Sequence, residues 1–197
     1  FGGAFVHSRN GLDTEYMSEE WLDLVSFCAD ELEREGMDAW LYDEDRWPSG
    51  TCGGDVTREP RYRLKFLSLR LMSGEEYARR DFGGALVGAY VLKLSGEPFP
   101  PLPGLDPRAG MRIESFEKLT GSAPGDALVA AVCVEEQAPE SFYNGFTYAD
   151  TMNPEATREF LNLTHEKYSA AFGDKFGKSV KGIFTDEPHR GALLSGF

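Results

Sequence analysis

The sequence places acidic residues at the ends of two short apolar stretches, and these acids are its main chemical signal. One apolar stretch, residues 180–184, leads through Thr185 into Asp186, Glu187 and then Pro188. A strand that stops on acids fixes the backbone and leaves the carboxylates at one edge of the sheet, where parallel-sheet enzymes place their chemistry. We therefore predict Glu187 as a catalytic acid and Asp186 as a substrate contact.

The second apolar stretch, residues 39–42, ends in a mixed run of acidic, basic and aromatic residues: Asp43, Glu44, Asp45, Arg46 and Trp47. Neighbouring carboxylates repel one another unless a cation compensates, and Arg46 is the local candidate. Successive side chains of a strand point in opposite directions, so the pattern leaves open which acids enter a cleft. Acids there would bind hydroxyl groups or a metal. Trp47 would stack on a sugar ring or plug the end of the sheet.

Two histidines stand at corresponding positions, because His7 ends the first apolar stretch and His189 follows Glu187. Together with the acids they could bind a metal, although the sequence has no HxH or HExxH spacing. Without a metal, both are expected to contact substrate. His165 falls inside an expected helix and is expected to be structural or exposed.

Paired carboxyl groups are what glycoside hydrolysis requires, one on each side of the bond to be broken. One of the two must hold a proton near neutral pH, which burial beside a second acid makes possible. Glu187 is the expected proton donor. Three alternatives stay open: a solvated acidic turn without chemistry, a metal-dependent barrel hydrolase, and a non-catalytic carbohydrate-binding barrel.

The first 45 residues predict the elements strand, helix and strand. Residues 1–7 are apolar, and Ser18 followed by two glutamates is a typical helix start. Apolar residues then recur on one helical face until Gly36 ends the helix, namely Trp21, Val25, Cys28 and Leu32. Residues 37–42 predict a buried strand, so the whole is a right-handed βαβ unit of a parallel sheet.

The rest of the chain predicts an insertion and then a return to the same pattern. Residues 57–72 are expected to be partly helical, and residues 80–135 to form an antiparallel β insertion. Asn153 and Pro154 predict the start of a helix that ends at Gly173, before the strand at 180. The expected organisation is therefore 1–79 and 136–197 in one α/β domain, interrupted by 80–135.

Composition excludes several classes of function. With 41% hydrophobic and 27% charged residues, the 197-residue chain has ordinary globular composition. A net charge of −13 argues against a nucleic-acid partner, since phosphate binding needs clustered Lys and Arg. No apolar run approaches the roughly 20 residues that span a bilayer, so no membrane partner is expected. The sequence indicates no cofactor and no oligomeric state.

The three cysteines fit neither a zinc motif nor a disulfide framework. We expect Cys28 and Cys133 to be buried thiols, and the missing framework slightly favours a cytoplasmic location. The chain opens as if inside a strand, without an initiator Met or a signal region. We therefore expect an internal fragment of a longer protein.

Three runs of the sequence, 2–9, 40–50 and 184–188, resemble a bacterial group of TIM-barrel glycoside hydrolases related to the α-L-rhamnosidases of glycoside hydrolase family 106. The most specific part is Tyr42 and its acids, followed by the Trp-Pro-Ser-Gly run. The resemblance implies a partial (β/α)8 barrel that carries the antiparallel β insertion and acts on a poly- or oligosaccharide.

The resemblance also implies roles for particular residues. Asp186-Glu187-Pro188 is similar to the Asn-Glu-Pro strand end of many barrel glycosidases, which makes Glu187 the general acid and puts Asp where those enzymes have Asn. Asp43 and Glu44 become sugar contacts. A full barrel needs about 250 residues, so the second catalytic carboxylate is expected beyond this chain.

Overall fold

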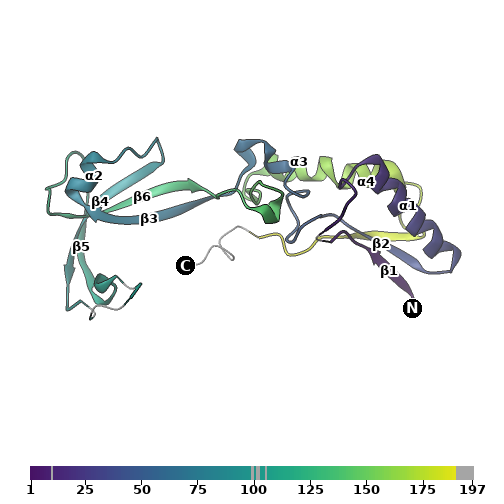
Figure 1. The fold of residues 1–197 in the computed structure, drawn as a ribbon, viewed down its shortest axis with the longest axis horizontal. Helices are drawn as coiled ribbons and strands as arrows, with labels where there is room; N and C mark the ends of the chain where they lie inside the picture. Colours follow the sequence, from purple (N-terminus) through teal and green to yellow (C-terminus); the bar gives the residue numbers. More distant parts are fainter. Residues whose placement is uncertain (10, 99, 101–102, 105, 190–197) are drawn as a thin grey trace. The chain divides into compact units, whose positions relative to one another are not determined.

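The structure is a computed structural model that describes residues 1–9, 11–98, 100, 103–104 and 106–189. The chain divides into two compact units, which Figure 1 shows as ribbons. The first unit combines Phe1–Lys65 with Glu136–Phe197, and the second is Phe66–Glu135. Each unit has its own sheet.

The sheet of the first unit has three strands in the order β1-β2-β7, namely Gly3–Val6, Asp38–Tyr42 and Val180–Phe184. The central strand β2 runs parallel to both neighbours, and Leu41 pairs with Val6 on one side and Ile183 on the other. Parallel strands require long crossovers. Helix α1 provides the first, and the second contains the inserted unit and two further helices.

Helix α1 spans Glu19–Arg34 and begins as predicted, since the Ser18 side chain accepts a hydrogen bond from the backbone N–H of Trp21 at 3.2 Å. Its buried residues recur every four positions: Trp21, Val25 and Ala29. Cys28 lies one position off this stripe, about 100° around the helix. The prediction that Cys28 is buried is therefore wrong, and its thiol is exposed.

The predicted helix after Asn153 consists of two helices. Helix α3 spans Pro154–Leu163, and α4 spans His165–Phe172. They separate at Thr164, whose φ of −122° and ψ of −74° depart from helical values. The Thr164 hydroxyl donates to the Phe160 carbonyl at 2.6 Å, a local bond that competes with helix continuation.

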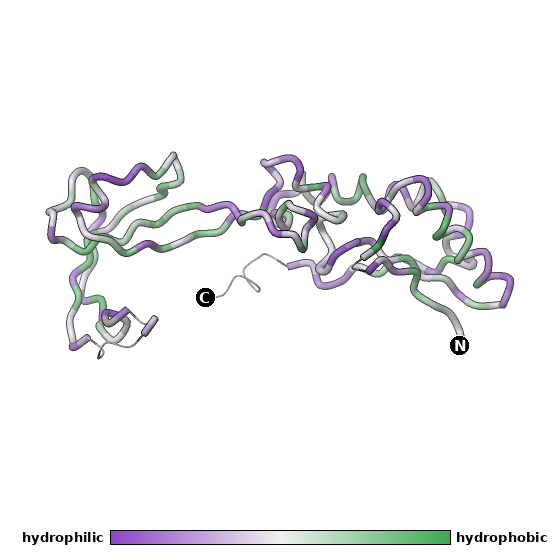
Figure 2. Tube along the Cα trace, in the orientation of Figure 1, coloured by the Kyte–Doolittle hydropathy of each residue, from purple (hydrophilic) through white to green (hydrophobic). Residues whose placement is uncertain are grey.

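Helices α1, α3 and α4 lie on the same side of the sheet of the first unit (Figure 1). Their amphipathic character is visible as alternating hydrophobic and hydrophilic segments along the trace (Figure 2). The core between helices and sheet is one cluster of buried residues: Met17, Trp21, Val25, Ala29, Ala39, Leu41, Cys52, Val56, Tyr62, Ala149, Ala156, Phe160, Tyr168, Phe172 and Val180.

The other face of this sheet exposes aromatic rings. Phe5, Trp40 and Phe184 are 54%, 38% and 41% exposed. The Phe5 ring lies 5.7 Å from each of the other two, measured between ring centroids. This sheet is thus covered on one face, whereas the continuous apolar pattern of β2 had predicted burial on both.

Residues 57–72 contain no α-helix, and the predicted partial helix is limited to short 3₁₀ turns before residue 63. Two 3₁₀ turns, η1 at Val56–Arg58 and η2 at Pro60–Tyr62, lead into the strand β3 at Lys65–Ser73. Pro60 cannot sit inside a helix, because it lacks an N–H and its ring clashes with the preceding turn. Leu67, Leu69 and Leu71 alternate with polar residues, the period of a strand.

The second unit holds a four-stranded sheet in the order β3-β6-β4-β5. Besides β3, the strands of this sheet are β4 (Leu86–Ser95), β5 (Arg112–Lys118) and β6 (Leu128–Glu136). The unit also contains helix α2 (Gly74–Arg79) and the 3₁₀ helix η3 (Pro107–Gly110). Strand β4 is antiparallel to both β5 and β6. Cys133 is buried as predicted, in the small core around Val129 and Ala131.

The predicted (β/α)8 barrel is wrong. Within the described residues the parallel sheet has three strands, and its outer strands β1 and β7 each pair only with β2, apart from an isolated bridge at Val180. A closed barrel gives every strand two neighbours. The second sheet lies in a separate unit. A βαβ unit occurs in open sheets as well as in barrels, so the strand-helix-strand pattern did not distinguish between them.

Within the part of the chain that the structure describes, no helix has the length and apolar composition needed to cross a membrane.

Candidate functional site

The predicted site residues follow the carboxyl ends of the three parallel strands. His7 comes directly after β1, residues 43–47 follow β2, and residues 185–189 follow β7. Because the strands are parallel and adjacent, these segments meet at one edge of the sheet. We call this region the strand-end site.

His7, Tyr42 and Asp186 are in contact there. The His7 and Tyr42 rings stack with centroids 3.6 Å apart and an interplanar angle of 18°. The Tyr42 hydroxyl lies 3.5 Å from Oδ2 of Asp186. Burial lowers the pKa of His7, which favours the neutral imidazole, and raises the pKa of Tyr42. One residue from each strand end thus contributes to a single cluster.

Trp47 and His189 lie on the same edge, with ring centroids 6.4 Å apart. The peptide bond between Trp47 and Pro48 is cis. The ring of His189 also stacks on Tyr148 at 4.4 Å, and burial lowers the pKa of His189. The Tyr148 hydroxyl donates to the Ser49 carbonyl at 2.7 Å, which attaches this aromatic group to the loop after β2.

A small cavity of about 160 Å³ opens at the strand-end site, and we call it the edge pocket. Its lining comes from the β1 and β2 ends and from one residue of the 3₁₀ helix η4 (Ser141–Tyr143): His7, Ser8, Arg9, Tyr42, Asp45, Arg46, Trp47 and Phe142. The structure thus brings together three of the predicted contacts, His7, Arg46 and Trp47. Asp186 reaches the pocket wall through Tyr42.

Asp43 is fully buried and is not available to a ligand, so its prediction as a sugar contact does not fit the structure. Its carboxylate accepts hydrogen bonds from the hydroxyls of Ser49 and Thr185, both at 2.6 Å. Nε2 of His165 lies 2.9 Å from its Oδ2. Asp43 therefore joins β2, the following loop, the start of α4 and the end of β7.

Glu44 is also fully buried, and its predicted sugar contact is equally blocked. Its two carboxylate oxygens accept six backbone N–H groups of the loop that follows, from Asp45, Arg46, Gly50, Thr51, Cys52 and Gly53. The Thr51 hydroxyl adds a further bond at 3.1 Å. Burial raises the pKa of Glu44 to about 7, while the N–H donors act in the opposite direction.

Asp186 and Glu187 remain as the acids after β7. Asp186 is held by its backbone, because its N–H donates to Oγ of Ser49 and its carbonyl accepts the Ser49 N–H, both at 2.9 Å. Glu187 is exposed and has a φ of +45°, in the left-handed region that non-glycine residues rarely adopt. Such strain costs free energy and is concentrated at functional sites.

The sequence did not predict the contacts that hold the strand ends in place, although His165 was expected to be structural or exposed. His165 is the first residue of α4, and it contacts Asp43 from there. Ser49 belongs to the Trp-Pro-Ser-Gly run, and its hydroxyl links Asp43 to Asp186. The feature of the sequence that could have indicated Ser49 is its position directly after Pro48, where a hydroxyl group is held in a restrained turn. No local pattern marked His165, since its partner lies 122 positions earlier.

The histidines do not form a metal site with the acids. Among the described residues, no group of three or more His, Cys, Asp or Glu side chains is arranged to hold a metal ion. His7 and His189 stack on Tyr42 and Tyr148 instead.

Comparison of the chain with protein-family models, with curated proteins and with solved structures finds no match. The resemblance to the rhamnosidase-related glycosidases therefore stays a prediction from the three sequence runs that carry it.

Proposed function

We propose that the strand-end site is the sugar-binding part of a glycoside hydrolase active site, with Glu187 as the proton donor. The observation that carries the proposal is the cluster of His7, Tyr42 and Asp186, to which each of the three parallel strands contributes one residue. Ligands of open parallel sheets bind at this edge.

The chemistry of the edge pocket suits a sugar. An aromatic surface such as that of Trp47 packs against the C–H face of a sugar ring, and polar groups fix the orientation of the ring through its hydroxyls. His7 supplies an imidazole that is neutral near pH 7 and can therefore both donate and accept. Arg46 and Asp45 add charged groups on the same wall.

Glu187 supports the catalytic part of the proposal. Asp43 and Glu44 are occupied by hydrogen bonds inside the protein, which leaves Asp186 and Glu187 as the acids after β7 with solvent access. The left-handed backbone at Glu187 sets the direction of its side chain and persists only because the surroundings enforce it. In the proposed reaction its carboxylic acid protonates the oxygen of the leaving group.

The test compares Glu187→Gln with wild type on a panel of glycosides that differ in sugar and in leaving group. Removing a general acid should slow hydrolysis of unactivated glycosides by about 10²- to 10⁴-fold. Dinitrophenyl glycosides need no protonation of the leaving group, so their rates should change little. Glu33→Gln, an exposed substitution late in α1, is the matched control and should leave all rates unchanged.

Wild-type rates for Glu187→Gln on unactivated glycosides would contradict the role of Glu187. Equal losses on activated and unactivated substrates would assign Glu187 to binding and not to proton transfer.

A second candidate is a carbohydrate-binding protein without catalysis. It is favoured by one observation, that Glu187 is not among the residues that line the edge pocket. Under this alternative a sugar quenches or shifts the fluorescence of Trp47 equally in wild type and in Glu187→Gln, and neither protein hydrolyses any glycoside of the panel.

A further inference from the structure

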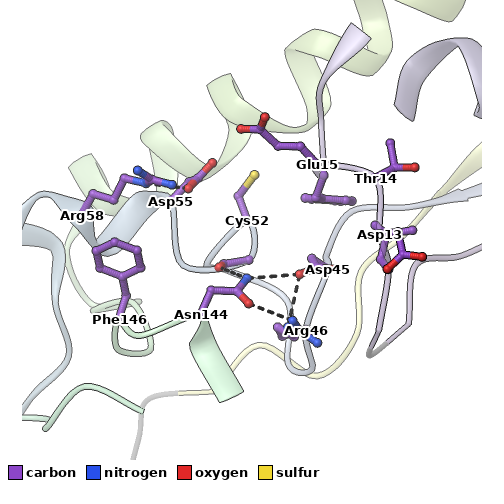
Figure 3. Close-up of a pocket in the computed structure, with 13 residues that line it drawn as sticks. Asp13, Thr14, Glu15, Asp45, Arg46, Cys52, Asp55, Arg58, Asn144 and Phe146 are labelled. Atoms are coloured by element: carbon purple, nitrogen blue, oxygen red, sulfur yellow. Dashed lines mark hydrogen bonds and ion pairs between the residues drawn. The ribbon is translucent and has the colours of Figure 1, made fainter. Parts of the chain in front are cut away.

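A second and larger cavity adjoins the edge pocket. It has a volume of about 300 Å³, and we call it the acidic pocket. Figure 3 shows Asp13, Thr14 and Glu15 on one part of its rim and Asp55, Arg58 and Phe146 on another. Asp45 and Arg46 line both cavities, so the two pockets share one wall.

The shared wall contains the Asp45 carboxylate, one oxygen of which has no hydrogen-bond donor among the described residues. The Asp45 side chain is only 7% exposed, and its Oδ2 contacts Nε of Arg46 at 3.2 Å and Nδ2 of Asn144 at 3.3 Å. Its Oδ1 is buried and has no hydrogen-bond partner among the described residues. An unpaired buried acceptor is unfavourable, and a hydrogen-bond donor from a bound molecule would satisfy it.

The other side of this wall is already fixed. Asn144 adopts a left-handed conformation with φ of +54°, donates to the Gly53 carbonyl at 2.7 Å and accepts from Arg46 at 2.8 Å. Arg58 lies over the ring of Phe146, with its guanidinium carbon 5.2 Å from the ring centroid. The acidic pocket is thus built from side chains that hold one another, which lowers the entropic cost of binding.

We infer that the acidic pocket is a second subsite, which takes the sugar unit next to the one in the edge pocket. This inference rests on the proposed function and makes its ligand an oligosaccharide of at least two units. The unit in the acidic pocket presents a hydroxyl or ammonium donor toward Asp45.

The charge of the acidic pocket selects among sugar units. Arg46 pairs with Asp45, and Arg58 pairs with Asp55 at 2.7 Å. Asp13 and Glu15 have no ion-pair partner within the described part of the chain and are exposed. The lining therefore carries excess negative charge, which disfavours a uronic acid and admits a neutral or amino sugar. Because these two acids are solvated, the selection weakens at high salt.

The test follows two side-chain N–H signals by NMR in the ¹⁵N-labelled chain. The Trp47 indole reports on the edge pocket, and the Asn144 amide reports on the acidic pocket. The probes are free monosaccharides and disaccharides of hexose, deoxyhexose, amino-sugar and uronic-acid units. The sugar units that shift Trp47 as monosaccharides are expected to shift both signals as disaccharides, with affinity at least fivefold higher.

A blocking variant separates occupancy of the acidic pocket from indirect effects. Thr14 lines the acidic pocket but not the edge pocket. Thr14→Trp should remove the gain in affinity from monosaccharide to disaccharide, while Thr14→Val, of similar shape, should retain it. Asp13→Asn combined with Glu15→Gln should raise the affinity for uronic-acid disaccharides severalfold at low salt and leave neutral ones unchanged.

Each outcome decides between the two ideas. If no sugar of the panel shifts Trp47, the proposed function fails and the subsite fails with it. If sugars shift Trp47 but no disaccharide shifts Asn144, or if Thr14→Trp keeps the full gain in affinity, the subsite alone is overturned. Equal affinity of wild type for neutral and uronic-acid disaccharides would overturn the charge selection.

Discussion

Nε2 of His165 lies 2.9 Å from Oδ2 of Asp43, although 122 positions separate the two residues in the sequence. Oδ2 also accepts the Thr185 hydroxyl, and Oδ1 accepts the Ser49 hydroxyl. One buried carboxylate therefore sets the position of a helix start, a loop and the end of β7. The geometry of the strand-end site depends on this contact, even though Asp43 itself cannot touch a ligand.

We predict strong energetic coupling between Asp43 and His165. A double-mutant cycle with Asp43→Asn and His165→Gln should give a coupling free energy of about 1–3 kcal/mol, because both groups share a buried hydrogen-bond network. Urea unfolding of the four proteins, followed by tryptophan fluorescence, measures it.

The exposed pair Glu31 and Arg34 in α1 is the control for that cycle, since both side chains are largely in solvent. Its coupling should stay below about 0.5 kcal/mol. A similar value for both pairs would mean that the Asp43 network contributes no more than a surface ion pair.

Glu44→Gln should destabilise the first unit strongly. Either orientation of the amide turns an NH₂ group toward backbone N–H donors that now bind an oxygen. A buried donor that loses its acceptor costs about 1–3 kcal/mol. Urea unfolding checks this against Glu33→Gln, which lies on the surface and should cost less than about 0.5 kcal/mol. A loss below 1 kcal/mol for Glu44→Gln would contradict the role of its carboxylate.

The pKa of Glu44 predicts a pH dependence of stability. Burial raises this pKa to about 7, against roughly 4.3 in an unfolded chain. Between these values the native state binds the proton and the unfolded state does not. The contribution of Glu44 to the free energy of unfolding is therefore full below about pH 4 and falls as the pH rises to 7, by about 3 kcal/mol.

Carboxyl ¹³C NMR of glutamate-labelled protein tests this directly. One glutamate signal should titrate with a midpoint near pH 7 and should belong to Glu44. Titration of the Glu44 signal below pH 4 would show instead that the backbone N–H donors dominate over burial.

The first unit should fold without the second. The two chain segments that connect the units are paired where they leave the first unit, since Gln137 N–H donates to the Leu64 carbonyl at 2.9 Å. Arg63 and Glu136 form an ion pair at 3.0 Å beside them. Replacing residues 66–135 by Asn-Gly, a two-residue turn that suits antiparallel strands, should preserve this pairing.

The expected outcome is a cooperative thermal transition and a near-ultraviolet circular dichroism spectrum that retains the signals of Trp21, Trp40 and Trp47. The control replaces the same segment by Pro-Pro, which cannot form the turn and should broaden the transition. A truncated protein with no cooperative transition would show that the first unit depends on the second.

Local signals predicted the elements of the first unit well. The N-caps Ser18 and Asn153 were recognisable because their side chains complete the first turn of a helix, and both do so. The apolar run of β2 predicted a parallel strand, and it pairs in parallel on both sides. These features depend on neighbouring residues, so the sequence alone carries them.

Features that depend on distant residues were predicted poorly. The barrel was wrong because a βαβ unit does not specify how many strands follow it. Strand β3 was missed because Tyr62, Phe66 and Leu69, spaced by four and three residues, were read as one side of a helix, although Leu67, Leu69 and Leu71 alternate as in a strand. Thr164 ends α3 through its own non-helical backbone conformation, and no glycine or proline at this position indicated a helix end.

The location of the candidate site was predictable, but the roles of its acids were not. Acids at parallel strand ends had to meet at one edge, and there Asp186 contacts Tyr42, which stacks on His7. Whether Asp43 and Glu44 faced a cleft or the interior depended on partners elsewhere. Ser49 and His165 bind one of them, and the loop 45–53 surrounds the other.

The loop around Glu44 has no regular secondary structure beyond turns, yet six of its backbone N–H groups point at one buried carboxyl group. The carboxyl group supplies hydrogen-bond acceptors to the backbone of this loop, as a neighbouring strand does in a sheet. Amide hydrogens of residues 50–53 should therefore exchange with solvent as slowly as those of a core strand. Arg46 and Trp47 belong to the same loop and line the edge pocket, so the geometry of this pocket wall depends on a buried side chain that does not line the pocket itself.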